Sequence, residues 1–245
     1  DLHRLIRRQR QMCIRDRQEE FKEILKNRKP KERLVLKEIE LFDMDFTSWN
    51  LSNIDFSLSA FHRVKFDEAN LEYSSVFNTL FDECTVRKTN FRHANLECAV
   101  LRYADMTGCN IEGANLYGAV LEYAKLDAII SDKDTKWFHL RCPEKGAFLA
   151  YKKCFNDRLV QLLIPADAKR TSATLPSCRC NKAKVLTIKS FDYKESYVEA
   201  WSLVDENFVY RVGEWVEVKD FNEDRWMDST TGIHFWMTRE EAKNY

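Results

Sequence analysis

Apolar residues recur at every fifth position between residues 41 and 126. The series has 18 members without an exception, in a chain in which 44% of all residues are hydrophobic, so chance does not explain it. Its members are Leu41, Phe46, Leu51, Phe56, Phe61, Phe66, Leu71, Val76, Phe81, Val86, Phe91, Leu96, Leu101, Met106, Ile111, Leu116, Leu121 and Leu126.

A period of five fits neither regular secondary structure. Five residues turn an α-helix by about 500°, and along a strand successive members would point to opposite faces. Neither arrangement buries one stripe. The pattern therefore predicts a chain that bends once in every five residues, so that each member of the series points toward a common axis.

A second inward position is predicted two residues before each member of the series. From residue 59 onward it holds mostly small side chains, such as Ala69, Ser74, Ala94 and Cys109. The first turn of chain has bulky groups there instead, namely Ile39, Met44, Trp49 and Ile54. We expect a wider first coil whose open end is covered by Trp49.

Four short segments identify the repeat. Ala69-Asn70-Leu71, Ala94-Asn95-Leu96, Ala104-Asp105-Met106 and Ala114-Asn115-Leu116 resemble the A-(D/N)-L core of the pentapeptide-repeat family. The resemblance implies a mainly β fold, a right-handed quadrilateral β-helix with four pentapeptides per coil, in which residue n stacks on residue n+20. Eighteen repeats would give about four and a half coils and a solenoid about 22 Å long.

Three regions follow from the pattern. Residues 1–35 are predicted to form a basic N-terminal arm and a capping helix, residues 36–130 the β-helix, and residues 131–245 a separate domain. Gln18 to Arg28 has a helical pattern that ends before Pro30. Met12 to Arg17 resembles translated adapter sequence, so residues 1–17 are expected to be foreign to the protein; a native nucleic-acid-binding arm is the alternative. After Leu126 we expect a polar link.

Two outward columns stand out when the repeat is aligned in rows of 20. Asn50, Asn70, Asn90 and Asn110 predict a ladder of amides that hydrogen-bond between coils. Another column holds Ala60, Leu80, Val100 and Val120, where the family usually has Asp or Asn. With Phe77 and Tyr117, the last three residues of this column are expected to form an apolar contact surface for the chain's own C-terminal domain, a second copy in a homodimer, or a protein partner.

The C-terminal segment predicts a mainly β domain with one helix. Strands fit residues 146–153, 158–164, 183–188, 197–203, 208–212, 215–218 and 233–237, and Thr238 to Glu241 has the sequence of a capping box. The segment resembles a domain of unknown function found after pentapeptide repeats in bacterial and phage proteins. Its matching pieces include Cys142-Pro143, residues 164–170, Ser177 to Cys180 and Gly232 to Phe235. The resemblance implies no particular activity.

Two groups of residues in this domain could carry chemistry. Cys142, Cys154, Cys178 and Cys180 are candidate zinc ligands, although their spacing lacks the paired knuckles of common zinc sites and buried thiols are the alternative. His234, Lys152 and Arg170 could form a polar pocket with a general base and cations that bind anions, or could be structural residues. The sequence contains no motif of a known catalytic class, and no cofactor is expected.

Charge and hydropathy limit the possible functions. The chain has 39 basic and 39 acidic residues, but residues 1–40 carry a net charge of +5, residues 41–130 of −6 and residues 131–245 of +1. No segment is apolar for long enough to span a membrane, so we expect a cytoplasmic protein with reduced thiols.

Three functions remain. We favour a non-catalytic scaffold that binds protein through a rigid repeat region and a C-terminal recognition domain. Some pentapeptide-repeat proteins inhibit type II topoisomerases by imitating DNA, but a duplex mimic of about 22 Å needs roughly 13 negative charges. The repeat falls short of that charge and nucleic acid is not an expected partner. The third hypothesis is an enzyme in the C-terminal domain.

Overall fold

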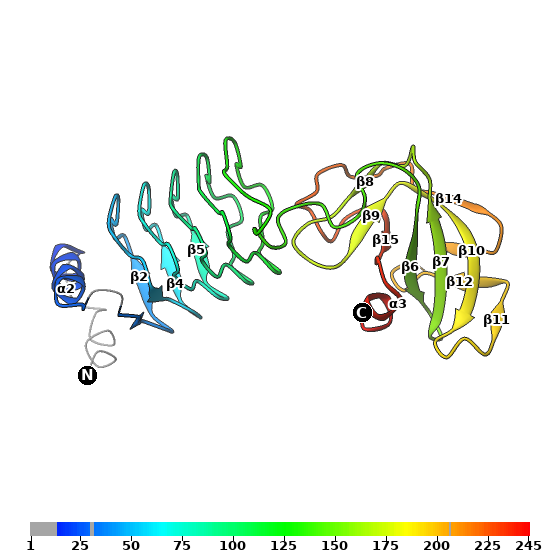
Figure 1. The fold of residues 1–245 in the computed structure, drawn as a ribbon, viewed down its shortest axis with the longest axis horizontal. Helices are drawn as coiled ribbons and strands as arrows, with labels where there is room; N and C mark the ends of the chain where they lie inside the picture. Colours follow the sequence, from blue (N-terminus) through cyan, green and yellow to red (C-terminus); the bar gives the residue numbers. More distant parts are fainter. Residues whose placement is uncertain (1–13, 30–31, 206) are drawn as a thin grey trace. The chain divides into compact units, whose positions relative to one another are not determined.

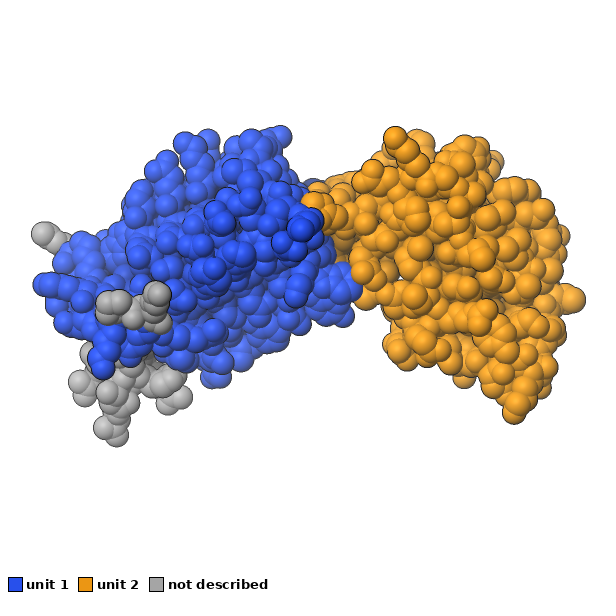
Figure 2. Space-filling model, viewed as in Figure 1, with its two compact units in different colours: residues 1–138 blue, residues 139–245 orange. Residues whose placement is uncertain are grey.

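The computed structural model describes residues 14–29, 32–205 and 207–245. The chain divides into two compact units, residues up to Phe138 and His139–Tyr245 (Figure 2). The first 13 residues of the predicted basic arm, and Pro30, lie outside the described residues. Strands and isolated β-bridges make up most of the regular secondary structure of the described residues, so the expected mainly β class is confirmed.

The first unit is held together by parallel pairing between residues 20 positions apart. After helix α2 (Ile14–Lys26), strand β1 (Leu34–Val35) pairs with β3 (Ile54–Asp55). Strands β2 (Glu40–Phe42), β4 (Ala60–His62) and β5 (Leu80–Asp82) pair side by side in successive turns of the chain (Figure 1). Isolated parallel bridges continue the same 20-residue register as far as Asn110 and Ile130.

The stripe of every fifth residue forms the interior of this unit. Members from Leu41 to Leu121 are at most 3% exposed, and Leu126 is half-buried. Phe61 and Phe81 lie one above the other, with ring centroids 5.3 Å apart. The prediction that this series is buried is confirmed from Leu41 to Leu121.

A bend in each repeat is visible in the backbone angles. Between Asp43 and Tyr103 every fifth residue has a positive φ, and glycines take over this position at Gly108, Gly113 and Gly118. This left-handed conformation costs a residue with a Cβ about 1–2 kcal/mol. Between successive bends the backbone bonds to the next turn, as in the 2.8 Å bond from Leu51 N to Asn70 O. The hydrogen bonds of each turn therefore offset the cost of its bends.

The small inward position satisfies carbonyl groups of the preceding turn. Thr79 and Thr89 donate their hydroxyls to the carbonyls of Phe56 and Phe66, 23 residues earlier, at 3.0 and 2.7 Å. Cys109 donates its thiol to Val86 O at 2.7 Å. Burial raises the pKa of the Cys109 thiol to about 12, so it stays protonated and can donate this bond.

Helix α2 covers the N-terminal end of the stripe. Phe21 is 1% exposed and lies 5.3 Å from the ring of Phe46. Trp49 is only half-buried and contacts the edge of Phe46 at 5.1 Å. The expected plug at Trp49 is therefore corrected: Phe21 is the buried aromatic residue at this end, and Trp49 packs beside it, because the helix supplies a ring that reaches the axis.

Pairing continues beyond the predicted polar link. Asn110 pairs with Ile130, and Asn115 pairs with Lys136, a spacing of 21. One inserted residue is accommodated there, and Thr135 takes the small inward position with a 3.1 Å bond to Ile111 O. The period of five did not predict this last turn, because the inserted residue shifts the repeat register by one position.

The second unit contains an antiparallel sheet of five strands among the described residues. Its strand order is β11-β10-β7-β6, with β14 paired to the other end of β10. The bounds are β6 (Phe148–Cys154), β7 (Arg158–Ile164), β10 (Lys182–Ser190), β11 (Ser196–Tyr197) and β14 (Trp215–Glu217).

Two smaller sheets complete the unit. Strands β8 (Arg170–Thr171) and β9 (Cys178–Cys180), which the pattern did not predict, form a sheet with β15 (Ile233–Phe235). Strand β12 (Glu199–Trp201) pairs with β13 (Val209–Arg211). Helix α3 (Arg239–Lys243) begins with the predicted capping box at Thr238, which is confirmed. No helix of the described segments has the length and apolarity needed to cross a membrane.

Candidate functional site

One outer column of the repeat unit is apolar. It runs through Ala60, Leu80, Val100 and Val120, each bridged to the next. Leu80 is 37% exposed, and Phe77, Val100, Tyr117 and Val120 are half-buried. The other bridged columns of the described repeat are mostly polar and include Asp45, Lys65, Thr85 and Asp105 in one of them. Backbone pairing therefore holds a strip of aliphatic side chains in register.

An unpredicted aromatic residue lies next to this strip. Trp137 contacts Tyr117 edge to face, with ring centroids 4.9 Å apart. Because one residue is inserted before Thr135, the repeat pattern does not extend to Trp137, and the sequence gave no indication that Trp137 contacts Tyr117. Tyr117 is thereby covered partly within the same unit, and Leu80 is the most exposed residue of the surface.

The predicted asparagine column forms a ladder over three of its four residues. Asn70 donates to Asn50 at 3.3 Å, and Asn90 donates to Asn70 at 2.8 Å. Asn110 instead donates to Glu112 at 3.1 Å. Each Asn also accepts a bond from the backbone N–H two residues later, as Asn70 does from Glu72 at 3.1 Å. These bonds give the column a structural role.

Several acidic residues of the repeat are paired with cations of neighbouring turns. Arg63 binds Asp43 through two nitrogens at 2.6 and 2.9 Å, and Arg102 lies 2.7 Å from Glu122. Further pairs join residues 20 positions apart, including Arg92 with Glu72 and Glu112 and Lys88 with Glu68. The surface is thus a mosaic of both charges.

The second unit contains a pocket of about 770 Å³ that brings two of the predicted site residues together. Lys152 on β6 and His234 on β15 both line it, and Lys152 Nζ donates to His234 O at 3.2 Å. Lys152 is 5% exposed, and burial lowers its pKa. The alternation of β6 explains its orientation, because Lys152 shares a face with Ala150 and Cys154, both fully buried.

His234 is held in one tautomer. Its Nε2 lies 3.1 Å from the carbonyl oxygen of Asp228, which can only accept, so Nε2 carries the proton. Burial lowers the pKa of His234, and the bond to Asp228 opposes this shift. The imidazole is therefore neutral at physiological pH, with Nε2 occupied by a backbone contact.

Arg170 does not join Lys152 and His234 in this pocket. Its guanidinium group donates to backbone carbonyls of Gly146, Pro165, Ala166 and Ala168 at 2.7 to 3.1 Å, and to Pro143 at 3.3 Å. The predicted grouping of three residues is corrected accordingly. Arg170 joins the segment at residues 143–146 to the segment at residues 165–168, a role that uses several of its N–H donors.

The four candidate zinc ligands are all buried in the core of the second unit. Cys142 and Cys178 share a hydrogen bond, which lowers the pKa of Cys142 and raises that of Cys178. Burial raises the pKa of Cys154 and Cys180 to about 12. Within the described ranges no group of three or more His, Cys, Asp or Glu side chains could hold a metal ion. In this structure the four thiols pack as apolar core groups.

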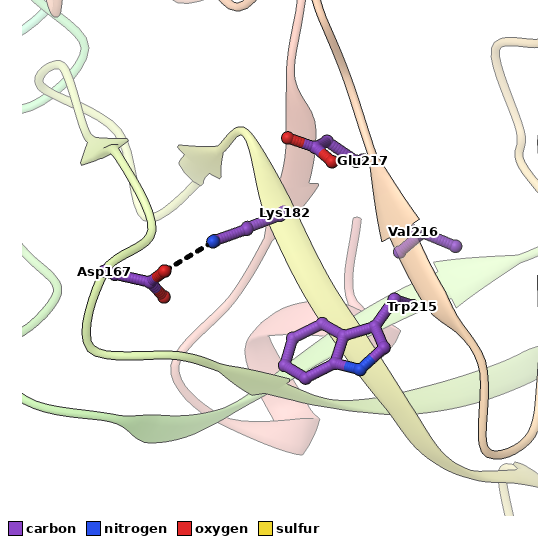
Figure 3. Close-up of a pocket in the computed structure, with 5 residues that line it drawn as sticks. All are labelled: Asp167, Lys182, Trp215, Val216 and Glu217. Carbon is purple, nitrogen blue, oxygen red and sulfur yellow. Dashed lines mark hydrogen bonds and ion pairs between the residues drawn. The ribbon is translucent and has the colours of Figure 1, made fainter.

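A smaller pocket lies over β10 and β14 (Figure 3). It has a volume of about 370 Å³ and is lined by Asp167, Lys182, Trp215, Val216 and Glu217. Lys182 Nζ lies 2.6 Å from Asp167, and Trp215 is 55% exposed. Because its lysine is already paired with a carboxylate, this pocket offers less unsatisfied polarity than the larger one.

Two family models match the chain. One describes pentapeptide repeats in eight copies and matches residues 77–113 and 94–128. The other is a family of unknown function, DUF5758, and matches residues 138–242. No curated protein matches the chain.

Solved structures with some similarity are pentapeptide repeat proteins. One, from the Arabidopsis thaliana thylakoid lumen, is 20% identical over 49% of this chain and 79% of its own, with a TM-score of 0.28. Another, from the cyanobacterium Cyanothece 51142, is 26% identical over 44% and 65%, with a TM-score of 0.17. QnrB1, a plasmid-mediated fluoroquinolone resistance protein, is 18% identical over 43% and 71%, with a TM-score of 0.16.

Proposed function

Because the chain joins a pentapeptide-repeat region to a C-terminal domain of the DUF5758 family, we propose that it is a non-catalytic protein-binding scaffold. In this proposal the repeat region presents a rigid surface to a protein partner. We also infer that this region is a right-handed quadrilateral β-helix. Its 20-residue register and its bend in every pentapeptide support that geometry.

The apolar column carries the proposal. Leu80, Val100 and Val120 occupy positions at which the neighbouring columns have polar residues, and their spacing is fixed by backbone bridges. A rigid surface loses little conformational entropy on binding, so modest apolar contact can produce affinity. An isolated apolar side chain needs no explanation, but a row of them on one outer face is typical of a contact surface.

Two other functions receive less support. A DNA mimic requires a continuous negative surface, whereas the acids of this repeat are interrupted by Arg63, Lys88, Arg92 and Arg102. A gyrase supercoiling assay tests this alternative, and inhibition at micromolar protein would favour it over a scaffold. In the enzyme alternative, a general base at His234 would have to act through Nδ1, because Nε2 carries the proton that it donates to Asp228 O.

The proposal is tested by replacing the apolar column in the intact chain. We expect Leu80→Thr/Val100→Thr/Val120→Thr to fold like the wild type by circular dichroism, because threonine suits extended chain, but to lose the protein captured by the wild type from a host lysate. Lys65→Thr/Lys125→Thr changes a polar column of the same repeat and is the control. The same captured proteins with both variants would contradict the proposal.

The same variants identify the occupant of the surface. If the surface joins two copies of the chain, analytical ultracentrifugation will show a dimer for the wild type and a monomer for the triple variant. A change in sedimentation at constant mass instead indicates docking of the chain's own C-terminal domain.

A further inference from the structure

Lys152 is a buried cation without a counter-charge in the described part of the chain. Its Nζ donates to His234 O, and the Tyr210 ring centroid is 5.8 Å away. The described residues provide no carboxylate within ion-pair distance. An ammonium group has three donors, and burying its charge unpaired is costly. The ammonium group of Lys152 can therefore still donate hydrogen bonds to an anion.

The pocket at Lys152 has the lining of a small-molecule site. Its volume of about 770 Å³ lies within the range typical of ligand pockets. Aromatic rings come from Phe208, Tyr210 and Trp236, and hydroxyl groups come from Ser202, Ser229 and Thr230. These residues belong to separate strands and loops, so the folded domain assembles a wall of apolar rings and polar groups around Lys152.

We propose that this pocket binds a small organic monocarboxylate with an apolar, ring-containing body, and that the carboxylate pairs with Lys152. The aromatic wall would contact the ring, and the hydroxyl groups would complete the hydrogen bonds of the carboxylate. The site belongs to the C-terminal domain and does not depend on the proposed contact surface of the repeat.

The charges around the pocket favour a monoanion over a phosphate ester. Asp205, Glu217 and Asp220 line the pocket and are exposed, with Lys219 as an exposed cation among them. The acidic rim would repel a dianionic phosphate, and the single buried ammonium group of Lys152 would neutralise only one of its two charges. A single carboxylate matches the single ammonium group, and a cationic substituent on the ligand would suit the rim.

Binding should depend on the protonation of Lys152. Burial raises the pKa of Cys154 and Cys180 to about 12 and that of Tyr210 well above its ordinary value, and it lowers that of His234. These neighbours therefore stay neutral between pH 7 and 10. Affinity for the carboxylate should fall as pH rises through the pKa of Lys152, because the ammonium form is the one that pairs.

Calorimetry on the intact chain tests the proposal with a panel of aryl carboxylates, such as benzoate and 3-phenylpropanoate, and their primary amides. We expect at least one carboxylate to bind, with its amide and inorganic phosphate at least tenfold weaker. Lys152→Met should weaken binding of the carboxylate at least tenfold. Lys189→Met removes a lysine from β10 of the same sheet, where it bonds Ser196, and should bind like the wild type.

A folding control separates loss of the site from loss of the domain. Lys152→Met removes an unpaired buried charge, so its thermal midpoint should equal or exceed that of the wild type. The proposal is overturned if no carboxylate of the panel binds, if the amides bind as tightly, or if a folded Lys152→Met protein retains the affinity.

Discussion

The imidazole of His93 lies against Gly113, 20 residues further along the chain. A Cβ built on Gly113 would come within 2.7 Å of His93 Cε1 and would overlap Nδ1. The other face of the imidazole stacks on Tyr73, with centroids 4.8 Å apart and an interplanar angle of 15°. Gly113 also has a φ of +67°, so both its conformation and its missing side chain are required there.

We therefore predict that Gly113→Ala destabilises the protein by about 1–3 kcal/mol, since the left-handed backbone costs about 1–2 kcal/mol and His93 must move. Gly108→Ala is a matched control at the preceding bend, with a φ of +72° and only the flexible Lys88 side chain nearby. Urea unfolding measures both variants, and the ring-current shifts of His93 report its displacement. Equal effects of the two substitutions would contradict the role given to His93.

The aromatic interior gives a second prediction. Phe61 is fully buried, and its ring contacts Phe56, Phe66 and Phe81 at centroid distances of 5.2 to 5.5 Å. Phe61→Ala should reduce the free energy of unfolding by about 3–5 kcal/mol, because the turns above and below cannot collapse into the cavity. Leu58→Ala, at an exposed bend three residues earlier, should change it by less than about 0.5 kcal/mol. Similar midpoints for the two variants would refute the stacked interior.

Acid should weaken the first coil through Asp55. Burial raises the pKa of this carboxyl group, but bonds from Ser57 and pairs with Arg33 and Lys37 at 3.1 and 3.3 Å outweigh burial and lower it. A depressed folded pKa contributes stability above the unfolded pKa near 4, and the contribution is lost as pH falls through the folded value.

Asp55→Asn should accordingly cost about 1–2 kcal/mol at pH 7. The difference from the wild type should shrink below about pH 4, because the wild-type carboxyl group then becomes neutral too. Asp127→Asn, an exposed residue of the same unit, should show neither effect. A difference between wild type and Asp55→Asn that stays constant down to pH 2 would exclude the linkage.

Arg179 should be the most sensitive charged residue of the C-terminal unit. It is 2% exposed and donates to the carbonyls of Asn222, Asp224 and Thr231, each at 2.9 Å. Arg179→Met leaves three acceptors unpaired and should cost about 3–5 kcal/mol. Since these carbonyls lie between β14 and β15, hydrogen exchange should increase first at residues 220–231. Arg211→Met, on the exposed side of β13, is the control, and equal loss in both variants would argue against a specific anchor.

The sequence predicted the interior of the repeat because one physical constraint repeats there. A side chain that returns to the axis every five residues must be apolar, and this requirement is visible from Leu41 to Leu121 without knowledge of the fold. The periodic pattern did not predict the shift to 21 residues before Lys136, since a single insertion leaves no periodic signal. It also did not place Lys152 on the buried face of β6, where the structure has it.

By itself the sequence determined which side chains of the repeat are buried, the apolar outer column and the alternating strands of the second unit, while the 20-residue register was implied by the resemblance to the pentapeptide-repeat family. The tertiary structure alone decided that Phe21 covers the first coil, that Arg170 and Arg179 bind backbone carbonyls, and that Lys152 faces a pocket with His234. The reason is physical. Local periodicity records contacts that recur at a fixed spacing, whereas a carbonyl group that only the fold brings close leaves no mark on the residue that binds it.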